Sequence, residues 1–380
     1  MLTFAAMMER PDWPILVFGA FCCITFIQII YYLYFFRRLA FRRDDSSISY
    51  HQQPVSVIVC ARDEAANLAK ILPGLLVQEF AGTHALILVN DNSLDESKYL
   101  LEALQKDFPQ LHIIELKQEA QFIKGKKFPL SIGIKTAKHD VVLLTDADCV
   151  PASEFWMHKM TAPFEQETEI VLGYGAYYKR KGLLNKIIRF ETFHTAVQYL
   201  SYALAGLPYM GTGRNLAYKK DVFFRNKGFS AHNHLPGGDD DLFINATATG
   251  RNTKVVTDKA SFTLSEPKRT WKDWRKQKQR HFTTSGLYKA KHRFLLGLYA
   301  LTHFLFYPAF IAALLLFRWE LAVGVFLLRF IIQSIIWYKA MEKLDEKDLW
   351  KWFWAFDIFM FFYYLIFTPS LWKKPQVNWK

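Results

Sequence analysis

Two aspartates, Asp146 and Asp148, are separated by a single residue and follow a short apolar run at 141–144. Two carboxylates at this spacing, where a buried strand ends, can bind one divalent cation, and such oxygen ligands suit Mg²⁺ or Mn²⁺. In proteins such an ion commonly bridges to substrate phosphates and neutralises a diphosphate leaving group. The pair therefore predicts a site for Mg²⁺ or Mn²⁺ that acts on a phosphorylated substrate.

Three consecutive carboxylates, Asp239, Asp240 and Asp241, follow two glycines and precede a helix-like segment at 242–248. Like charges this close repel one another, and burial would raise the pKa of at least one of them. A carboxylate with a raised pKa is suited to removing a proton as a general base. A solvated cap on the helix is the alternative interpretation, because acidic side chains also stabilise helix N-termini.

Further polar residues follow other apolar runs and are candidates for binding a nucleotide. Asp91 lies in a turn at 90–93. We interpret it as an acceptor of hydrogen bonds from a nucleobase, although such residues also form ordinary turns. Lys126 and Lys127 follow Gly125 and precede a predicted helix, where backbone N–H groups and cations can bind phosphate. An exposed basic loop is the alternative for these lysines.

Two later segments are also candidates for binding. The glycines of 211–215 either let the backbone approach a sugar or form a simple turn. The segment 271–281 interleaves tryptophans with cations, a pattern typical of a helix in the lipid headgroup layer. On that helix Gln277 and Arg280 are three residues apart and share one face, so both can reach into a site.

The residues between these motifs alternate between two patterns. Short apolar, β-branched runs predict buried strands, and segments with apolar residues three or four apart predict helices. The strands are expected at 55–59, 85–89, 111–116 and 141–144, and the helices at 64–78, 94–107 and 128–138. This alternation predicts an α/β fold with a doubly wound, mostly parallel sheet. Because ligands bind beyond the carboxyl ends of such strands, we expect the acidic residues to converge there.

The composition indicates that part of the chain is embedded in a membrane. Of 380 residues, 51% are hydrophobic, and 48 basic against 35 acidic residues give a net charge of +13. Long apolar runs, each of a length that can cross a bilayer, lie at 13–36, 294–317, 321–338 and 353–372. The chain is therefore expected to comprise a transmembrane anchor at 1–36, a domain at 37–293 and a C-terminal membrane region at 294–380.

Basic residues beside the apolar runs predict the orientation of a multi-pass membrane protein. Four arginines follow the first run directly: Arg37, Arg38, Arg42 and Arg43. The positive-inside rule therefore places the domain at 37–293 in the cytoplasm. Because the cations flank apolar runs, they favour contact with anionic membrane lipids over nucleic acid. Four membrane spans would leave the C-terminus outside. The basic tail at 373–380, however, favours the inside. A C-terminal segment that lies in the membrane interface or re-enters the membrane would remove this conflict.

Two charged residues, Arg329 and Asp357, lie inside the C-terminal apolar runs. Charges at membrane depth are costly and usually face a partner or a cavity. We therefore expect these two side chains to form an ion pair with each other.

Together these motifs resemble those of the family 2 glycosyltransferases, membrane-associated enzymes with a GT-A nucleotide-sugar fold. The resemblance covers residues 54–282, nearly all of the domain between the apolar runs. Five segments correspond to motifs of this family. Residues 61–64 correspond to ARNE and residues 90–93 to DD.S. Residues 125–127 correspond to GK, 146–148 to DxD and 277–281 to QxxRW. The sequence departs from these patterns at Asp63, Asn90 and His281, which replace Asn, Asp and Trp.

The resemblance implies a GT-A type mixed sheet, mostly parallel and flanked by transmembrane helices. It also implies the inverting transfer of a sugar from a nucleotide diphosphate sugar, UDP-linked. The implied donor-binding residues are Arg62, Glu64, Asp91, Lys126, Lys127 and Asp146. The implied contacts of acceptor and diphosphate are Gln277, Arg280 and His281, and the implied metal ligands for Mg²⁺ or Mn²⁺ are Asp146 and Asp148.

The family's catalytic base is the Asp of a Glu-Asp pair. Counting back from Leu242 identifies Asp239 as this base, with Gly238 in place of Glu, and a shift of one residue gives Asp240 instead. The implied acceptor is lipid-linked or a polysaccharide, and the implied location is a bacterial inner membrane. Two other functions stay open: an inactive scaffold or carbohydrate-binding subunit with this fold, and a nucleotidyltransferase, which shares the α/β sheet and acidic metal site. The oligomeric state also stays open.

Overall fold

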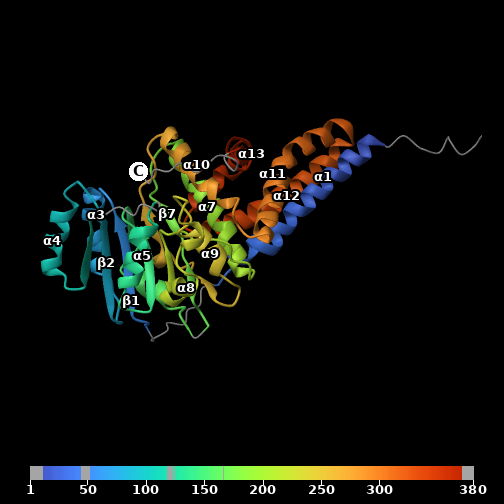
Figure 1. Cartoon of the computed structure of the whole chain (residues 1–380). Helices are drawn as coiled ribbons and strands as arrows, with labels where there is room; N and C mark the ends of the chain where they lie inside the picture. The colour runs from blue at the N-terminus through green and yellow to red at the C-terminus, as the bar shows by residue number, and fades with distance from the viewer. Residues whose placement is uncertain (1–11, 44–51, 118–122, 124, 166, 370–380) are drawn as a thin grey trace, which may run out of the picture.

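The computed structural model describes residues 12–43, 52–117, 123, 125–165 and 167–369, apart from the side chains of 281 and 282. Figure 1 shows a domain built around a sheet, with long apolar helices that project from one side of it. The domain and the helices meet at α7, which lies centrally between them.

The central sheet has seven strands in the order β3-β2-β1-β4-β8-β6-β9. They are β1 (Val55–Ala61), β2 (His84–Asp91), β3 (Leu111–Leu116), β4 (Val141–Asp146), β6 (Ile170–Leu172), β8 (Leu216–Lys219) and β9 (Thr253–Val255). Strands β1 to β4 pair in parallel, as do β6 and β9, whereas β8 is antiparallel to β4 and β6. Every residue of β1 is buried, which explains why its sequence is apolar apart from Ser56. The predicted α/β fold with a mixed, mostly parallel sheet is confirmed.

Three helices connect the first four strands: α3 (Ala65–Leu76), α4 (Ser97–Asp107) and α5 (Lys127–Thr136). Pro73 lies inside α3 and does not end it. Helix α4 begins three residues later than predicted, because the Asp95 carboxylate accepts hydrogen bonds from the N–H groups of Ala65 and Ser97 at 2.8 and 3.0 Å. These bonds hold the preceding residues in a turn beside the start of α3.

Helix α7 (Leu183–Leu204) has no counterpart in the sequence prediction. It is buried around most of its circumference, and its buried residues include the polar Arg189, Glu191 and His194. Polar residues within the buried surface interrupt the apolar spacing from which helices are predicted. Their partners lie far along the chain, so the sequence alone does not reveal why they are tolerated.

Short elements complete the domain. A second sheet has the order β5-β10-β7, formed by β5 (Cys149–Pro151), β10 (Thr263–Ser265) and β7 (Gly175–Tyr177). The remaining helices are α6 (Trp156–Thr161), α8 (Lys220–Arg225), η2 (Ser230–His232), α9 (Asp241–Thr247), η3 (Lys259–Ser261) and α10 (Trp271–Ser285). Helices α9 and α10 correspond to the predicted segments at 242–248 and 271–281.

Four helical stretches are long and apolar enough to cross a membrane, judged by length and composition among the described residues. They are α1 (Trp13–Ile30) with its continuation in η1 (Tyr31–Phe36) and α2 (Arg37–Ala40), α11 (Ala290–Leu316), α12 (Trp319–Lys343), and η4 (Lys347–Trp352) with α13 (Phe353–Phe367). In Figure 1, α1, α11 and α12 lie side by side, whereas α13 lies near α10. Residues 370–372 of the last predicted run are outside the described part of the chain.

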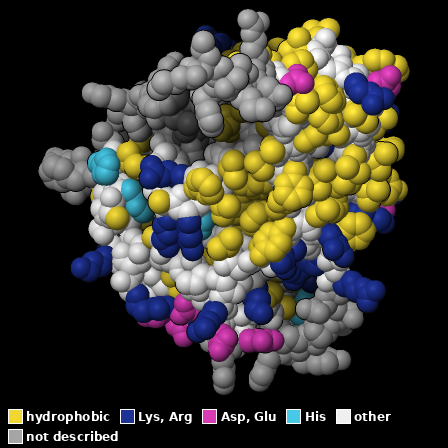
Figure 2. Space-filling model, turned by 90° about the vertical axis from the view of Figure 1, so that its right-hand side faces the viewer, with side chains coloured by type: hydrophobic (Ala, Val, Ile, Leu, Met, Phe, Trp, Pro, Cys, Tyr) yellow, Lys and Arg dark blue, Asp and Glu magenta, His cyan; other side chains and the backbone are white. Residues whose placement is uncertain are grey.

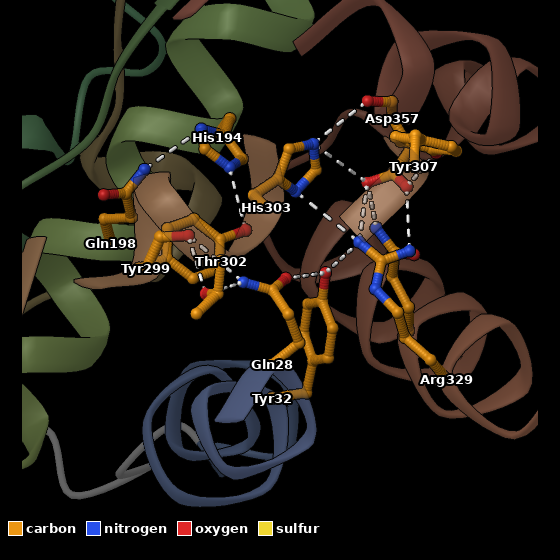
Figure 3. A network of polar contacts seen from close by, with 11 residues as sticks. Gln28, Tyr32, His194, Gln198, Tyr299, Thr302, His303, Tyr307, Arg329 and Asp357 are labelled. Carbon is orange, nitrogen blue, oxygen red and sulfur yellow. Dashed lines mark hydrogen bonds and ion pairs between the residues drawn. The ribbon is translucent and has the colours of Figure 1, made fainter. Parts of the chain in front are cut away.

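The expected ion pair between Arg329 and Asp357 is confirmed. The Arg329 Nη1 and Asp357 Oδ2 atoms are 2.9 Å apart, and both side chains are buried. Figure 3 shows that this pair belongs to a polar network that includes residues of α1, α7, α11, α12 and α13. Both charged groups therefore have partners, as burial among apolar helices requires.

The outer surface of these helices is apolar. Figure 2 shows a broad patch of hydrophobic side chains with Lys and Arg side chains near its border. Large exposed side chains in these helices include Phe26, Leu315, Leu328 and Ile331, each exposed by more than half. Extended exposed apolar patches mark contact with a membrane or with another protein.

Candidate active site

One cavity of about 1250 Å³ lies where the carboxyl ends of β1 and β4 meet α9, α10 and α7. The predicted site residues that line it are Arg62, Glu64, Lys126, Asp146, Asp148, Asp239, Asp240, Gln277 and Arg280. Asp91 and Lys127 are not part of its wall, and the side chain of His281 is not described. The fold therefore brings together residues that are up to 218 positions apart in the chain, from Arg62 to Arg280.

The two aspartates of the DxD triplet lie at the end of β4. One ligand atom each from Asp146, Asp148 and Cys149 lie within 4.8 Å of one another. The Cys149 thiol is buried, which raises its pKa well above the ordinary value, and it lies 2.9 Å from the Ser265 hydroxyl. A protonated thiol is a poor metal ligand. The two carboxylates are therefore the fitting ligands, and their oxygens suit Mg²⁺ or Mn²⁺.

The carboxyl groups of Asp146 and Asp148 differ in pKa because their charged neighbours differ. Burial would raise the pKa of Asp146, but the ion pair with the Lys126 ammonium group holds it below the ordinary value. Asp148 has a raised pKa because of partial removal from water and the neighbouring charge of Asp146, although its side chain reaches solvent. Asp146 is thus the carboxylate that stays charged most readily, and Asp148 loses its proton at higher pH.

Arg214 is a cation of the site that the sequence prediction missed. Its guanidinium lies over the Tyr177 ring, 4.5 Å from the ring centre, and lines the cavity. The charge of Arg214 lowers the pKa of both Asp146 and Asp148. Its Nη1 atom is buried without a hydrogen-bond partner in the described part of the chain. Only the glycine-rich segment 211–215 marks this place in the sequence.

The acidic cluster begins helix α9. Gly238 has φ +96°, and a Cβ atom there would lie 2.6 Å from Leu242 Cδ1. This geometry explains why glycine stands where the family pattern has Glu. Asp240 accepts hydrogen bonds from the N–H groups of Gly213 at 2.8 Å and Asp241 at 2.7 Å. Burial, together with the charges of its acidic neighbours, raises the pKa of Asp240 to about 8.

The other two acids of the cluster have different surroundings. Asp241 is buried, and its Oδ2 atom accepts hydrogen bonds from Thr284 Oγ1 at 2.5 Å and from the Tyr288 hydroxyl at 2.8 Å. This ties the start of α9 to the end of α10. Asp239 lines the cavity and has no hydrogen bond among the residues that the structure describes.

The two lysines after Gly125 point in different directions. Lys126 lines the cavity, but Lys127 is fully buried and its ammonium group donates to the carbonyl oxygens of Leu235, at 2.6 Å, and Gly237. Lys127 therefore holds the loop that leads to Asp239 and has its donors engaged by the backbone. Gly125 completes this contact, since a Cβ atom there would lie 2.2 Å from the Pro236 carbonyl oxygen.

Polar contacts connect the residues that follow β1 with those at the end of β2. Arg62 Nη1 lies 4.0 Å from Asp91 Oδ2, and Asp91 is buried at the end of β2. The Asp63 carboxylate accepts a hydrogen bond from the N–H of Leu94 at 2.7 Å, with Asp63 at φ 54°. Asp91 thus lies behind Arg62, which itself reaches the cavity wall.

Helix α10 joins the cavity to the apolar helices. Gln277 and Arg280 line the cavity, and the Gln277 amide donates to the Tyr177 hydroxyl at 3.4 Å. Lys278 forms a buried ion pair with Glu191 of α7. Trp274 is buried, with its ring centre 5.6 Å from that of Phe367 in α13. One side of α10 packs against protein, whereas Trp271 and Arg275 on the helix are exposed, so its predicted place in the headgroup layer stays a prediction.

Comparison with known proteins identifies the family. Residues 51–284 match the family described as Glycosyltransferase like family 2, which is more than half of the chain. The chain belongs to this family. The match includes every residue of the sequence-based site prediction.

Curated relatives of this family 2 chain are similar over a limited region. It is 29% identical to a beta-monoglucosyldiacylglycerol synthase of Nostoc sp. over 139 residues and 28% identical to the Synechocystis sp. protein of the same name over 150 residues. These regions cover 36% and 39% of this chain, and 28% and 29% of the relatives. The chain thus matches less than a third of the length of these relatives.

A solved structure resembles the chain over nearly its full length. It is the mannosyltransferase PcManGT from Pyrobaculum calidifontis, in complex with GDP-Man and Mn²⁺. The TM-score is 0.56 at 16% sequence identity, and the alignment covers 93% of this chain and 98% of that chain. At this identity the likeness concerns the fold.

In this family 2 chain the cavity extends beyond the polar residues. Its wall continues along α11 with Leu296, Gly297, Ala300, Leu301 and Phe304. It also includes Met360, Tyr363, Tyr364 and Leu365 of α13 and Thr368 directly after that helix. The acidic residues and the apolar helices therefore share one open cavity.

Proposed function

We propose that the chain is a membrane-bound inverting glycosyltransferase that moves a sugar from a nucleotide diphosphate sugar, UDP-linked, to a hydroxyl group of a lipid-linked acceptor. One cavity carries this proposal. Its wall combines the Asp146 and Asp148 carboxylates, which suit a metal ion, with several cations, an acidic cluster and apolar helices. Membership of family 2 supports the same activity. A pocket with a few convergent polar groups of perturbed pKa is the expected form of an active site.

Asp146 and Asp148 are the proposed ligands of Mg²⁺ or Mn²⁺, which when bound neutralises the departing diphosphate. The structure of PcManGT in complex with GDP-Man and Mn²⁺ supports this choice. Lys126, Arg214 and Arg280 line the same part of the cavity and would neutralise the remaining phosphate charge. Arg62 and Glu64, backed by Asp91, would contact the nucleoside.

Asp239 is the proposed general base, because its carboxylate reaches the cavity while Asp240 and Asp241 are engaged as hydrogen-bond acceptors. The Asp239 carboxylate takes the proton of the acceptor hydroxyl as that oxygen bonds to the anomeric carbon. The bond from this carbon to the diphosphate oxygen breaks, and the nucleoside diphosphate leaves. Attack opposite the leaving group inverts the anomeric configuration. Gln277 would orient the acceptor.

A lipid acceptor is favoured over a polysaccharide for two reasons. The cavity wall includes the surfaces of α11 and α13, which are apolar helices. The curated relatives are named for the synthesis of a glucosyldiacylglycerol. Diacylglycerol is therefore the first acceptor to test, and the implied location is a bacterial inner membrane with the catalytic domain at 37–293 in the cytoplasm.

We also propose that only α1, α11 and α12 span the bilayer. Segment η4 runs back along α12, since Trp350 Nε1 donates to the Ser334 carbonyl at 3.3 Å and the Phe353 ring lies 5.0 Å from that of Phe330. Helix α13 then crosses α11, where Phe361 stacks on Phe304 at 4.8 Å.

Both ends of this segment contact the catalytic domain. At the start, Glu346 and Asp348 form ion pairs with Arg189 of α7, and at the end Phe367 packs on Trp274 of α10. A helix that begins and ends on the same side of the membrane is re-entrant. This arrangement supports a cytoplasmic C-terminus and so agrees with the basic tail at 373–380. An epitope tag after Lys380 should be reached by antibody only in inverted vesicles; labelling in right-side-out vesicles would contradict it.

The activity is tested by a donor screen on the purified protein in vesicles that contain diacylglycerol. We expect nucleotide release from a UDP-sugar that depends on Mn²⁺ or Mg²⁺ and on the lipid. Tight binding of metal and nucleotide with no turnover of any donor would contradict the proposal and favour a non-catalytic subunit. Release that depends on a soluble oligosaccharide, and not on lipid, would favour a polysaccharide acceptor.

A further inference from the structure

Helix α11 lines the cavity with Arg293 and Leu296 near its start and with four residues that form a regular stripe. Gly297, Ala300, Leu301 and Phe304 are spaced at i, i+3, i+4 and i+7, so they form one stripe along the helix. A Cβ atom at Gly297 would meet no other atom within 4 Å. The stripe is therefore apolar, and open space lies in front of its first residue.

Helix α13 presents a matching face. Met360, Tyr364 and Thr368 are spaced at i, i+4 and i+8 and line the same cavity, together with Leu365. Leu301 of α11 and Leu365 of α13 are 54% and 55% exposed, although both also line the cavity. The cavity thus has an apolar rim on the outer surface of the membrane helices.

The gap between the two helices closes at its deep end. Phe304 and Phe361 stack there with ring centres 4.8 Å apart and planes within 4° of parallel. Next to this stack, the Tyr307 hydroxyl donates to Asp357 Oδ2 at 2.5 Å. His303 also lies 3.1 Å from the Asp357 carbonyl oxygen. These contacts join α11 to α13 beyond the stack.

The polar network in Figure 3 fixes the orientation of α11 about its own axis. Tyr299, Thr302 and His303 point into the network, on the side of α11 away from the cavity stripe. Gln28 of α1 donates to Thr302 Oγ1 at 2.7 Å and to the Tyr299 carbonyl at 3.1 Å. Because these bonds hold one face, the opposite face stays turned toward the gap.

We propose that the gap between the Gly297–Phe304 stripe of α11 and the Met360–Thr368 face of α13 is the binding site for the apolar tail of the acceptor lipid. This inference rests on the proposed function and adds the place and depth of the tail. The tail enters from the bilayer past Leu301 and Leu365 and ends at the Phe304–Phe361 stack. The hydroxyl end of the lipid then lies toward Asp239 in the same cavity.

The chemistry along the cavity favours this occupant. The stripe offers apolar side chains, as do Met360 and Leu365 of α13, so an acyl chain that leaves the bilayer meets surroundings of similar polarity. The polar Glu191, Lys278 and Tyr363 line the same cavity, where Glu191 pairs with Lys278 and accepts from the Tyr363 hydroxyl at 3.2 Å. A glycan chain in the gap would leave its hydroxyl groups against apolar walls without partners.

The test uses the full chain in phosphatidylglycerol vesicles with a diacylglycerol that carries a diazirine in one acyl chain. Light-induced labelling is expected on peptides that contain 297–304 and 360–368. Gly297→Trp fills the gap and should reduce this labelling by about tenfold, which corresponds to about 1.4 kcal/mol. Gly324→Trp is the matched control, because Gly324 also has open space before its Cβ position and lies on α12 outside the cavity.

The outcomes separate this inference from the proposed function. Labelling of the gap without sugar transfer would leave the tail site intact and refute the activity. Sugar transfer to diacylglycerol with labelling only on outward residues such as Leu315, unchanged in Gly297→Trp, would overturn the tail site and keep the activity. A correctly folded Gly297→Trp protein with wild-type labelling of 297–304 would also overturn it.

Discussion

Lys126 forms an ion pair with Asp146, the first acid of the proposed metal site. The Lys126 ammonium group thus pairs with the same carboxylate that the proposed metal ion would bind. If the proposed ion and a diphosphate both bind, we expect the lysine to pair with a phosphate instead. Such an exchange would link metal binding to donor binding.

The first prediction is that Lys126→Met has opposite effects on the two ligands. Without a donor, the affinity for Mn²⁺ should rise by about tenfold or more, because a competing cation close to the carboxylate is removed. Turnover of the nucleotide sugar should fall, because a phosphate contact is lost. Mn²⁺ titration by electron paramagnetic resonance and a nucleotide-release assay measure the two effects. Lys135→Met, which alters an exposed lysine of α5, should change neither; weaker Mn²⁺ binding in Lys126→Met would contradict the exchange.

The second prediction distinguishes the two candidates for the base. Asp239→Asn should lower kcat by about 10²–10⁴-fold, the usual contribution of a general base, with little change in donor KM. Asp240→Asn loses one of two hydrogen bonds at the start of α9, because the Gly213 and Asp241 N–H groups bond to different oxygens of Asp240 and Asn keeps only one of them. Because Asp240 is not the proposed base, kcat should still fall less. Steady-state kinetics of both variants make the comparison. A larger loss in Asp240→Asn would transfer the role of base to Asp240.

The third prediction concerns pH and stability. The pKa of Asp240 is raised from 3.8 to about 8 in the folded protein, so the folded state holds this proton more tightly than the unfolded state. Its stabilising contribution is present below the unfolded pKa and is lost as pH rises through the folded pKa. The free energy of unfolding should therefore fall between about pH 4 and pH 8, and Asp240→Asn should flatten this dependence.

Thermal unfolding in detergent with a chelator, followed by tryptophan fluorescence, measures this effect. Asp140→Asn serves as the control, because the Asp140 side chain is 92% exposed. The same slope in Asp240→Asn and in the wild-type protein would show that Asp240 does not titrate in this range.

The α/β core was predictable because its strands are buried on both faces. Val55–Ala61 is apolar except for Ser56, so the sequence marks it without help from the rest of the chain. The acids Asp91 and Asp146 were placed at the carboxyl edge for the same reason, and both are the last residues of their strands. Here local pattern and tertiary position agree.

Other features depend on partners that are distant in sequence. Helix α7 keeps Arg189 and Glu191 buried because Glu346 and Lys278 pair with them, and no local pattern shows this. The sequence predicts Lys127 as a phosphate ligand. Its ammonium group instead donates hydrogen bonds to backbone carbonyl groups more than a hundred residues away. The course of α13 across α11 likewise follows from contacts, since its composition alone matches a spanning helix.

The fourth prediction tests the buried pair in the membrane region. Arg329→Asp or Asp357→Arg leaves two like charges buried together and should lower the free energy of unfolding by about 3–5 kcal/mol. The double swap should recover part of this loss, because opposite charges again face each other. Thermal unfolding in detergent measures all three variants, with Arg318→Asp at an exposed position as control. Single alanine variants at both positions that unfold like the wild type would show that the pair is dispensable.

The central claim is that the chain transfers a sugar to a lipid with inversion at the anomeric carbon. The most direct measurement is mass spectrometry and NMR of the lipid product formed in vesicles from an α-linked UDP-sugar, diacylglycerol and Mn²⁺. The account predicts a diacylglycerol that carries one β-linked sugar, formed by the wild-type protein and lost in Asp239→Asn and Asp148→Asn. A product with an α-linked sugar, or undiminished product from folded Asp239→Asn, would contradict it.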